Sequence, residues 1–175
     1  MFARIEFLQL GHDLFKTTPA SYGGHLLPGD VFDPSFLCIA EPSEDVSSAP
    51  AIDLSSPESL NPLHGRISVI VASKLFHCFI EDKQLRLARA LAGLLSAQPG
   101  SVICGDQIGA LEKGTATCDI LGTKHELFLH SPQTWTSLWD GETFTKGSVK
   151  VETKLVDVMA QKVSLKMMVW SVMRL

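Results

Sequence analysis

The chain has 175 residues, of which 45% are hydrophobic and 19% are charged, and its formal net charge is -4 at pH 7. This length fits a single globular domain, and the mild negative charge argues against nucleic acid or an anionic membrane as the main partner. The apolar stretches are shorter than the roughly 18 residues that a membrane-spanning helix needs. The composition therefore favours a globular protein that binds neither nucleic acid nor a membrane.

The four cysteines, Cys38, Cys78, Cys104 and Cys118, are widely spaced and form no CxxC pair. Such spacing predicts neither a zinc motif nor a disulfide framework. The sequence also contains no HxH or HExxH pattern, so we expect no metal site. Free thiols are typical of a reducing compartment, and we expect a cytoplasmic protein.

The first third of the chain predicts one helix, one strand and a connection. Apolar residues at helical spacing indicate an amphipathic helix over about residues 6–16. The stretch HLLPGDVF at 25–32 predicts a short buried strand. Residues 41–62 are rich in Ser, Pro and acidic residues and predict an exposed connection, with a helical turn near Pro57 to Leu60.

The middle of the chain predicts a strand–helix–strand unit. RISVIVAS at 66–73 is a continuous β-branched run, which is typical of a parallel, central strand covered on both faces. Leucines and alanines at helical spacing over 82–95 predict a helix, and SVICG at 101–105 predicts a second buried strand. The unit has the length of a right-handed βαβ crossover.

The last third predicts a loop, a helix and a hairpin. A long polar loop follows to about Lys124, and SPQTWTSLW then predicts a helix with Ser131 as its N-cap and a proline at its first position. SVKVETKLVDV at 148–158 alternates apolar and charged residues, and LKMMVWSVM at 165–173 is more apolar throughout. Two such strands, joined by a few residues, indicate an antiparallel hairpin.

Several of these blocks, taken together, resemble one protein family. Successive segments of class I methyltransferase-like proteins of fungal secondary metabolism are similar to the stretches FLQLGHDLFK, LPGDVFDPSFL, LFHCFIEDKQLRLARALAGLLSAQPGSVICGDQIG, LFLHSPQTWTSLWDGETF and KVETKL. The resemblance runs from about residue 5 to the C-terminus. It implies an α/β protein with a depleted Rossmann-like methyltransferase fold, in which a mostly parallel sheet ends in a C-terminal antiparallel hairpin.

The resemblance also implies a single methyltransferase-like domain over 1–175. Residues 1–40 would be the remnant of its N-terminal half, 41–65 the exposed connection, and 66–175 the βαβ unit with the hairpin. The family's first strand has no counterpart in this alignment, and an unpaired strand edge is costly to expose. We therefore expect a rearranged sheet or a homodimer, with the homodimer preferred.

The cofactor site is where the chain departs from the family pattern. The family's GxGxG-type loop, whose amides hold S-adenosylmethionine, has no counterpart in the sequence. By resemblance, Asp30 sits where the family binds the adenine amine and is a cofactor-binding remnant. We therefore expect a protein that uses no cofactor, with S-adenosylmethionine as the alternative.

Candidate site residues follow the two predicted parallel strands, because open α/β sheets bind ligands at the carboxyl ends of their strands. Lys74 and His77 follow the first strand, and they are candidate catalytic groups together with His130, since histidine titrates near neutrality. The candidate substrate contacts are Phe76, Asp106, Gln107, Trp135 and Trp139.

Each of these residues also has a structural alternative. His77 lies between two phenylalanines in sequence, where it can pack for structure, and His130 precedes a helix cap. Asp106 and Gln107 are equally suited to forming a turn. Two tryptophans four residues apart share one helix face, where core packing is the ordinary role.

The predicted function is a SAM-independent tailoring enzyme, a cyclase or isomerase that acts on a hydrophobic polyketide or terpenoid intermediate in the vacated cleft. Such chemistry needs a largely apolar pocket and one group that moves a proton. A SAM-dependent methyltransferase, either shortened or completed by a partner chain, is the alternative. A non-catalytic helper subunit of such an enzyme is a third hypothesis.

Overall fold

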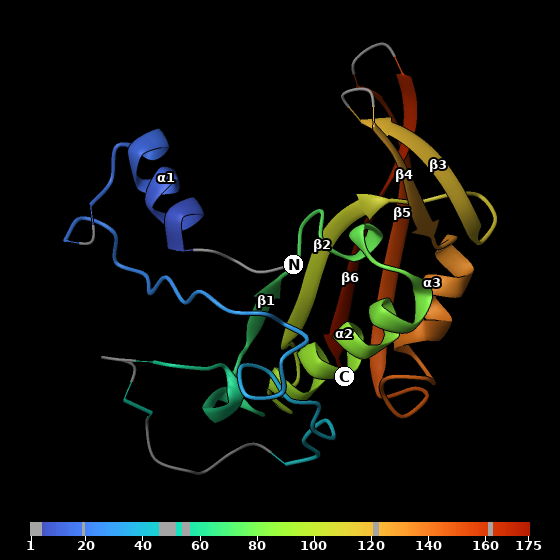
Figure 1. Cartoon of the computed structure of the whole chain (residues 1–175). Helices are drawn as coiled ribbons and strands as arrows, with labels where there is room; N and C mark the ends of the chain where they lie inside the picture. The colour runs from blue at the N-terminus through green and yellow to red at the C-terminus, as the bar shows by residue number, and fades with distance from the viewer. Residues whose placement is uncertain (1–4, 19, 46–51, 54–56, 121–122, 161–162) are drawn as a thin grey trace.

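The computed structural model describes residues 5–18, 20–45, 52–53, 57–120, 123–160 and 163–175. The described elements, in chain order, are α1 (Ile5–Phe15), η1 (Asn61–Leu63), β1 (Val69–Val71), η2 (Phe76–Cys78), α2 (Glu81–Leu94), β2 (Val102–Ile108), β3 (Gly114–Ile120), β4 (Thr123–Leu129), α3 (Pro132–Trp139), β5 (Val149–Ala160) and β6 (Val163–Arg174). The protein is of the α/β class, as expected (Figure 1).

The main sheet has the strand order β1-β2-β6-β5. β1 and β2 are parallel, whereas β6 is antiparallel to both β2 and β5. The C-terminal antiparallel hairpin is therefore confirmed, but the expectation of a mostly parallel sheet is wrong for the described strands. The reason is that the hairpin contributes two 12-residue strands. These strands pair with each other and β6 also pairs antiparallel with β2, while a single crossover supplies the parallel pair.

Helices α2 and α3 cover one face of this sheet (Figure 1). Side chains from α2, α3, β2 and β6 form the core there, and an edge-to-face aromatic cluster lies at its centre, made by Phe76, Trp135, Trp139 and Trp170. Large aromatic side chains bury the most apolar area per residue. The helix-covered face is therefore the hydrophobic core of the protein.

Local sequence signals explain where the helices begin. Ser131 is the N-cap of α3, and its hydroxyl accepts a hydrogen bond from the backbone of Thr134, whose own hydroxyl accepts from the backbone of Ser131. This reciprocal pair satisfies two backbone donors that the helix leaves free. Glu81 and Asp82 occupy the first turn of α2, where carboxylates favour the helix dipole. The predicted helices at 6–16, 82–95 and 131–139 are confirmed within one or two residues.

Two sequence predictions in the loops are wrong. Residues 25–32 form no strand, because Pro28 and Gly29 interrupt the run and the Asp30 carboxylate accepts a hydrogen bond from the Phe32 amide in a tight turn. The expected polar loop before Lys124 is instead a second sheet, in which β3 pairs antiparallel with β4. The short helical turn expected at Pro57 to Leu60 lies a few residues later, as η1.

The position of β1 also differs from its prediction. The strand is parallel to β2, as expected, but it lies at the edge of the described sheet. Val69 is 60% exposed and Val71 is 69% exposed. A continuous β-branched run was expected to be covered on both faces, and here one face carries no covering element among the described residues. The same described residues include no helix that is long and apolar enough to cross a membrane.

Candidate functional site

The first group of candidate residues lies where β1 and β2 end. Lys74 Nζ lies 2.5 Å from a carboxylate oxygen of Asp106, and the backbone amide of Lys74 donates to the Asp106 carbonyl at 2.6 Å. Lys74 adopts a left-handed conformation with a φ of 52°, which is uncommon for a residue with a side chain. The chain thus turns sharply out of β1, and this turn places the ammonium group over the end of β2.

His77 belongs to the same group. Its Nδ1 accepts a hydrogen bond from the amide of Ile108 at 3.2 Å, so the neutral ring carries its proton on Nε2. Burial lowers the pKa of His77, the nearby Lys74 lowers it further, and Asp106 opposes the shift. The hydrogen bond from Lys74 lowers the pKa of Asp106. At neutral pH the group therefore consists of an ion pair beside an uncharged imidazole.

The second group is centred on His130, which follows β4 and is only 3% exposed. Its Nδ1 lies 3.0 Å from Thr134 Oγ1. The same hydroxyl accepts from the amide of Ser131 and donates to the Ser131 carbonyl, so a lone pair remains for the His130 ring. We therefore assign the proton of the neutral imidazole to Nδ1, which leaves Nε2 as an acceptor. This buried Nε2 has no hydrogen-bond partner.

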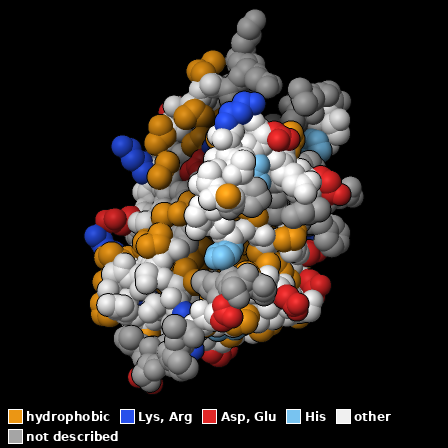
Figure 2. Space-filling model, turned by 90° about the vertical axis from the view of Figure 1, so that its left-hand side faces the viewer, with side chains coloured by type: hydrophobic (Ala, Val, Ile, Leu, Met, Phe, Trp, Pro, Cys, Tyr) orange, Lys and Arg blue, Asp and Glu red, His pale blue; other side chains and the backbone are white. Residues whose placement is uncertain are grey.

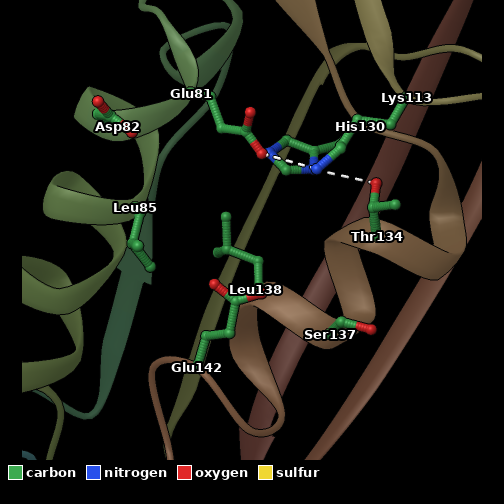
Figure 3. Close-up of a pocket in the computed structure, with 9 residues that line it drawn as sticks. All are labelled: Glu81, Asp82, Leu85, Lys113, His130, Thr134, Ser137, Leu138 and Glu142. Carbon is green, nitrogen blue, oxygen red and sulfur yellow. Dashed lines mark hydrogen bonds and ion pairs between the residues drawn. The ribbon is translucent and has the colours of Figure 1, made fainter.

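A cavity of about 190 Å³ lies beside His130 (Figure 3), and its lining residues are Glu81, Asp82, Leu85, Lys113, His130, Thr134, Ser137, Leu138 and Glu142. Lys113 forms an ion pair of 2.8 Å with Glu81. A larger hollow of about 390 Å³ shares Glu81 and Asp82 with the cavity and adds the apolar side chains of Ile80, Leu127 and Phe128. The two hollows share two lining residues and are here called the groove; both have polar and apolar side chains in their walls.

The environment of His130 keeps its ring uncharged. Burial lowers the pKa of His130 to about 4, Glu81 opposes this shift, and Lys113 adds to it. A ring with this pKa is neutral at pH 7 and presents the Nε2 lone pair as its polar group. Because Nε2 is itself buried, a hydroxyl group of a ligand would reach it only after neighbouring side chains move.

One buried side chain holds the walls of the groove together. Gln84 of α2 is fully buried, and its amide donates to the carbonyls of Phe79 and Phe128, each at 2.8 Å. These carbonyls belong to the segment after η2 and to β4. Gln84 therefore ties both histidine-bearing segments to the same helix, although His77 is not among the residues that line the His130 cavity.

Several predicted substrate contacts lie in the core instead. Phe76, Trp135 and Trp139 are fully buried in the aromatic cluster, and Gln107 is buried on the helix-covered side of β2. None of these four lines the His130 cavity. For the two tryptophans the alternative of core packing is what the structure shows, because the helix face that they share is turned toward the sheet. Phe76 and Gln107 require the same correction.

Of the residues that line the cavity, sequence reasoning predicted His130 alone, and the missed residues include Glu81, Lys113 and Thr134. Thr134 could have been found from the Ser-x-x-Thr spacing at the start of α3, which brings its hydroxyl back to the N-cap. Lys113 could not, since the segment before β3 was expected to be a loop without a fixed place. The cavity lining is also more polar than the apolar cleft that the sequence suggested.

Known proteins that are similar to this chain include fungal methyltransferases and one solved methyltransferase structure. No protein-family profile matches the chain. It is 29% identical to the O-methyltransferase phiE of a fungal species over 148 residues, which are 83% of this chain and 41% of that protein. It is 26% identical to the methyltransferase ausD of Aspergillus calidoustus over 159 residues, 89% of this chain and 46% of that protein.

Two further matches are shorter or structural. The chain is 32% identical to the Asnovolin E/Chermesin D methyltransferase nvfJ of Aspergillus novofumigatus over 89 residues, 51% of this chain and 31% of that protein. A crystal structure of a SAM-dependent methyltransferase from Methanosarcina mazei matches 64% of this chain and 61% of its own, with 10% identity and a TM-score of 0.49.

These sequence similarities support a methyltransferase-like protein. More narrowly, the chain is similar to methyltransferases of fungi, which confirms the resemblance that the sequence blocks indicated. The chain spans less than half the length of the curated relatives that it matches.

The expectation that the protein uses no cofactor is not supported by the comparisons, because the relatives are named as methyltransferases. Asp30 is the one residue that the resemblance assigns to the cofactor. One of its carboxylate oxygens accepts a hydrogen bond from the amide of Phe32 in a local turn, and Asp30 does not line the groove beside His130.

Proposed function

We propose that this protein acts in the methylation of a hydrophobic small molecule and contributes the part of the site that holds the methyl acceptor. The observation that carries the proposal is the groove at His130. It lies in a chain similar to fungal methyltransferases, and it combines one unpartnered buried acceptor with an apolar extension. The donor-binding part of the site would then come from residues outside those described here.

The groove favours a particular kind of acceptor. A hydroxyl group would donate to Nε2 of His130 once the side chains that bury this nitrogen move, and the apolar body of the molecule would lie along Ile80 and Phe128. The cavity of about 190 Å³ is smaller than the roughly 300–1,000 Å³ of most small-molecule sites. It therefore admits the reacting group of the acceptor while the larger hollow takes the rest. Loss of the proton during methylation would be assisted by the same ring nitrogen.

A SAM-independent cyclase or isomerase is the second candidate function. It is favoured by the two uncharged imidazoles, His77 and His130, because Nε2 is the free nitrogen of both rings and carries a proton in His77 but a lone pair in His130. Such a pair suits proton transfer within one substrate. The two functions differ in their product, since an isomerisation leaves the mass of the substrate unchanged, whereas methylation adds one carbon.

The test is an incubation of the full 175-residue chain with a panel of hydrophobic phenols, alcohols and carboxylic acids. Each compound is supplied with and without methyl-labelled S-adenosylmethionine, and mass spectrometry follows the products. In parallel, quenching of tryptophan fluorescence reports binding of the same compounds, since Trp135 lies 5.4 Å from His130 between ring centroids. A calorimetric titration with S-adenosylmethionine shows whether the chain binds the donor by itself.

Each outcome separates the hypotheses. A compound that binds with an affinity reduced by His130→Gln, and that takes up the label, supports methyl-acceptor binding. Binding that depends on His130, without label uptake by the chain alone, supports an acceptor part that needs its donor part. Conversion without added cofactor to a product of equal mass overturns the proposal in favour of the cyclase or isomerase. No binding of any compound favours the non-catalytic helper subunit.

A further inference from the structure

The hydroxyl group of Thr134 serves the start of α3 and the ring of His130 at the same time. It accepts a hydrogen bond from the amide of Ser131 at 3.0 Å and donates to the Ser131 carbonyl at 3.2 Å. Nδ1 of His130 lies 3.0 Å from the same oxygen. A threonine hydroxyl has one proton and two lone pairs. The proton and both lone pairs are therefore used when Nδ1 of His130 carries the ring proton.

Counting protons distinguishes the two neutral forms of the His130 ring. With the proton on Nδ1, the ring N–H, the Ser131 amide and the Thr134 hydroxyl all have acceptors. With the proton on Nε2, a buried N–H group is left without an acceptor, because Nε2 has no hydrogen-bond partner. Buried donors without a partner are costly and are rarer than acceptors with a free lone pair. The network at the start of α3 therefore favours the form whose Nε2 carries a lone pair.

The ring of His130 is held in place, whereas charged side chains beside it are not. The ring packs edge-to-face against Phe128 and Trp135, with 5.2 Å and 5.4 Å between ring centroids. Lys113 and Glu81 line the same cavity (Figure 3), and their side chains are 44% and 47% exposed. Ion pairs at this exposure are weak. Lys113 and Glu81 can therefore move at low cost while the His130 ring keeps its orientation.

We propose that Thr134 is a positioning residue that sets the specificity of this site, because its hydroxyl holds His130 in the form whose Nε2 binds only hydrogen-bond donors. This inference rests on the proposed function, since it concerns the methyl acceptor. An acceptor with a free hydroxyl has a proton to donate to Nε2. The methyl ether of the same molecule has none, and its oxygen meets the lone pair of Nε2 with a lone pair of its own. The site therefore retains the free hydroxyl compound and releases its methyl ether.

The first measurement locates the proton on His130 by nitrogen NMR of the imidazole rings of the full chain at neutral pH. A ring nitrogen with a lone pair resonates far downfield of one with a proton. Figure 2 shows histidine side chains at the surface, and the other histidines are half-buried or exposed, so they serve as internal references. We expect a lone pair on Nε2 in the wild type and in Thr134→Ser, and a mixture of both forms in Thr134→Val. Ser131→Ala is the matched control, because it weakens the cap of α3 but keeps the Thr134 hydroxyl, and it should retain the lone pair.

The second measurement compares the binding of naphthol and of its methyl ether, followed by the ring signals of His130. In the wild type, naphthol is expected to bind about tenfold more tightly than the ether, which is the effect of one hydrogen bond. Thr134→Ser and Ser131→Ala should keep this ratio. Thr134→Val should bring the ratio close to one, because its His130 ring also presents a proton on Nε2.

The two measurements separate this inference from the proposed function. A lone pair on Nε2 that Thr134→Val alone disturbs, together with the matching change in the binding ratio, supports the inference. A proton on Nε2 in the wild type overturns it without any ligand, and so does a lone pair that persists in Thr134→Val. Equal binding of the two compounds by the wild type overturns the specificity while methyl-acceptor binding stands, whereas binding of neither counts against both. Circular dichroism checks the fold, and Thr134→Ala replaces Thr134→Val should the latter not fold.

Discussion

The two faces of the main sheet are made by the same four strands, yet they differ in how deeply their side chains are buried and in whether helices cover them. On the helix-covered face, Ile103, Met168 and Val172 are fully buried beneath α2 and α3. On the opposite face, alternate residues of the same strands are half-buried or exposed, among them Val69 and Val169. Side chains alternate across a strand, so each strand places every second side chain in the buried core and the others on the uncovered face.

This difference shows how stability and interaction are divided in the molecule. The covered face holds the aromatic cluster and carries most of the buried apolar area, so it accounts for folding. The open face and the β1 edge carry exposed apolar side chains such as Val69 and Val71, so they contribute less to folding. Substitutions of the same chemical kind should therefore have large effects on one face and small effects on the other.

The largest effect is expected for Phe76→Ala. Phe76 contacts Trp135, Trp139 and Trp170 edge-to-face and is fully buried. Its removal leaves a cavity among large rings, and the free energy of unfolding should fall by about 3–5 kcal/mol. Urea denaturation followed by tryptophan fluorescence measures this change. A loss below about 1 kcal/mol would show that the cluster is not the centre of the core.

The next effect is the pH dependence contributed by His130. Its pKa is lowered from 6.5 to about 4 in the folded protein, so between these values the unfolded chain binds a proton that the folded chain does not. The stabilising contribution is complete above pH 6.5 and is lost as the pH falls toward 4, with a total of about 3 kcal/mol. Denaturation of the wild type and of His130→Gln across this range isolates it. Parallel curves for the two proteins would contradict the assignment.

A matched pair of valines in β6 compares the two faces directly. Val172 is fully buried on the covered face, whereas Val169 is 51% exposed on the open face. Val172→Ala should lower the free energy of unfolding by about 2 kcal/mol, and Val169→Ala should change it by less than about 0.5 kcal/mol. Thermal denaturation of both variants measures the difference. Equal losses would mean that the open face is covered in solution, even in the monomer.

The smallest effect is expected at Lys74. Its ion pair with Asp106 lies at the surface, and exposed pairs contribute roughly 0–1 kcal/mol. Lys74→Ala should therefore leave stability nearly unchanged while raising the pKa of Asp106 toward its ordinary value, because the hydrogen bond from Lys74 is the largest cause of its depression. NMR titration of the Asp106 carboxyl measures this shift. A stability loss above about 2 kcal/mol would show that the pair is structural.

The amino-acid sequence by itself determined the elements whose signals are local. The helical spacing of Leu85, Ala88 and Leu91 marked α2, the capping residue Ser131 marked the start of α3, and the alternation from Val149 to Leu155 marked one strand of the hairpin. Each of these patterns acts over one or two turns or strand repeats, so it can be read without knowing what the segment packs against. The family resemblance rests on the same local blocks.

Tertiary structure alone decided the rest, because those features depend on which segments meet. A β-branched run predicts a strand equally well at the centre or at the edge of a sheet, and only the strand order showed that Val69 and Val71 lie exposed at an edge. The groove beside His130 joins side chains from α2, the segment before β3, and α3. Its chemistry follows from the burial of His130 and from the ion pair between Lys113 and Glu81, which arise when distant parts of the chain pack together.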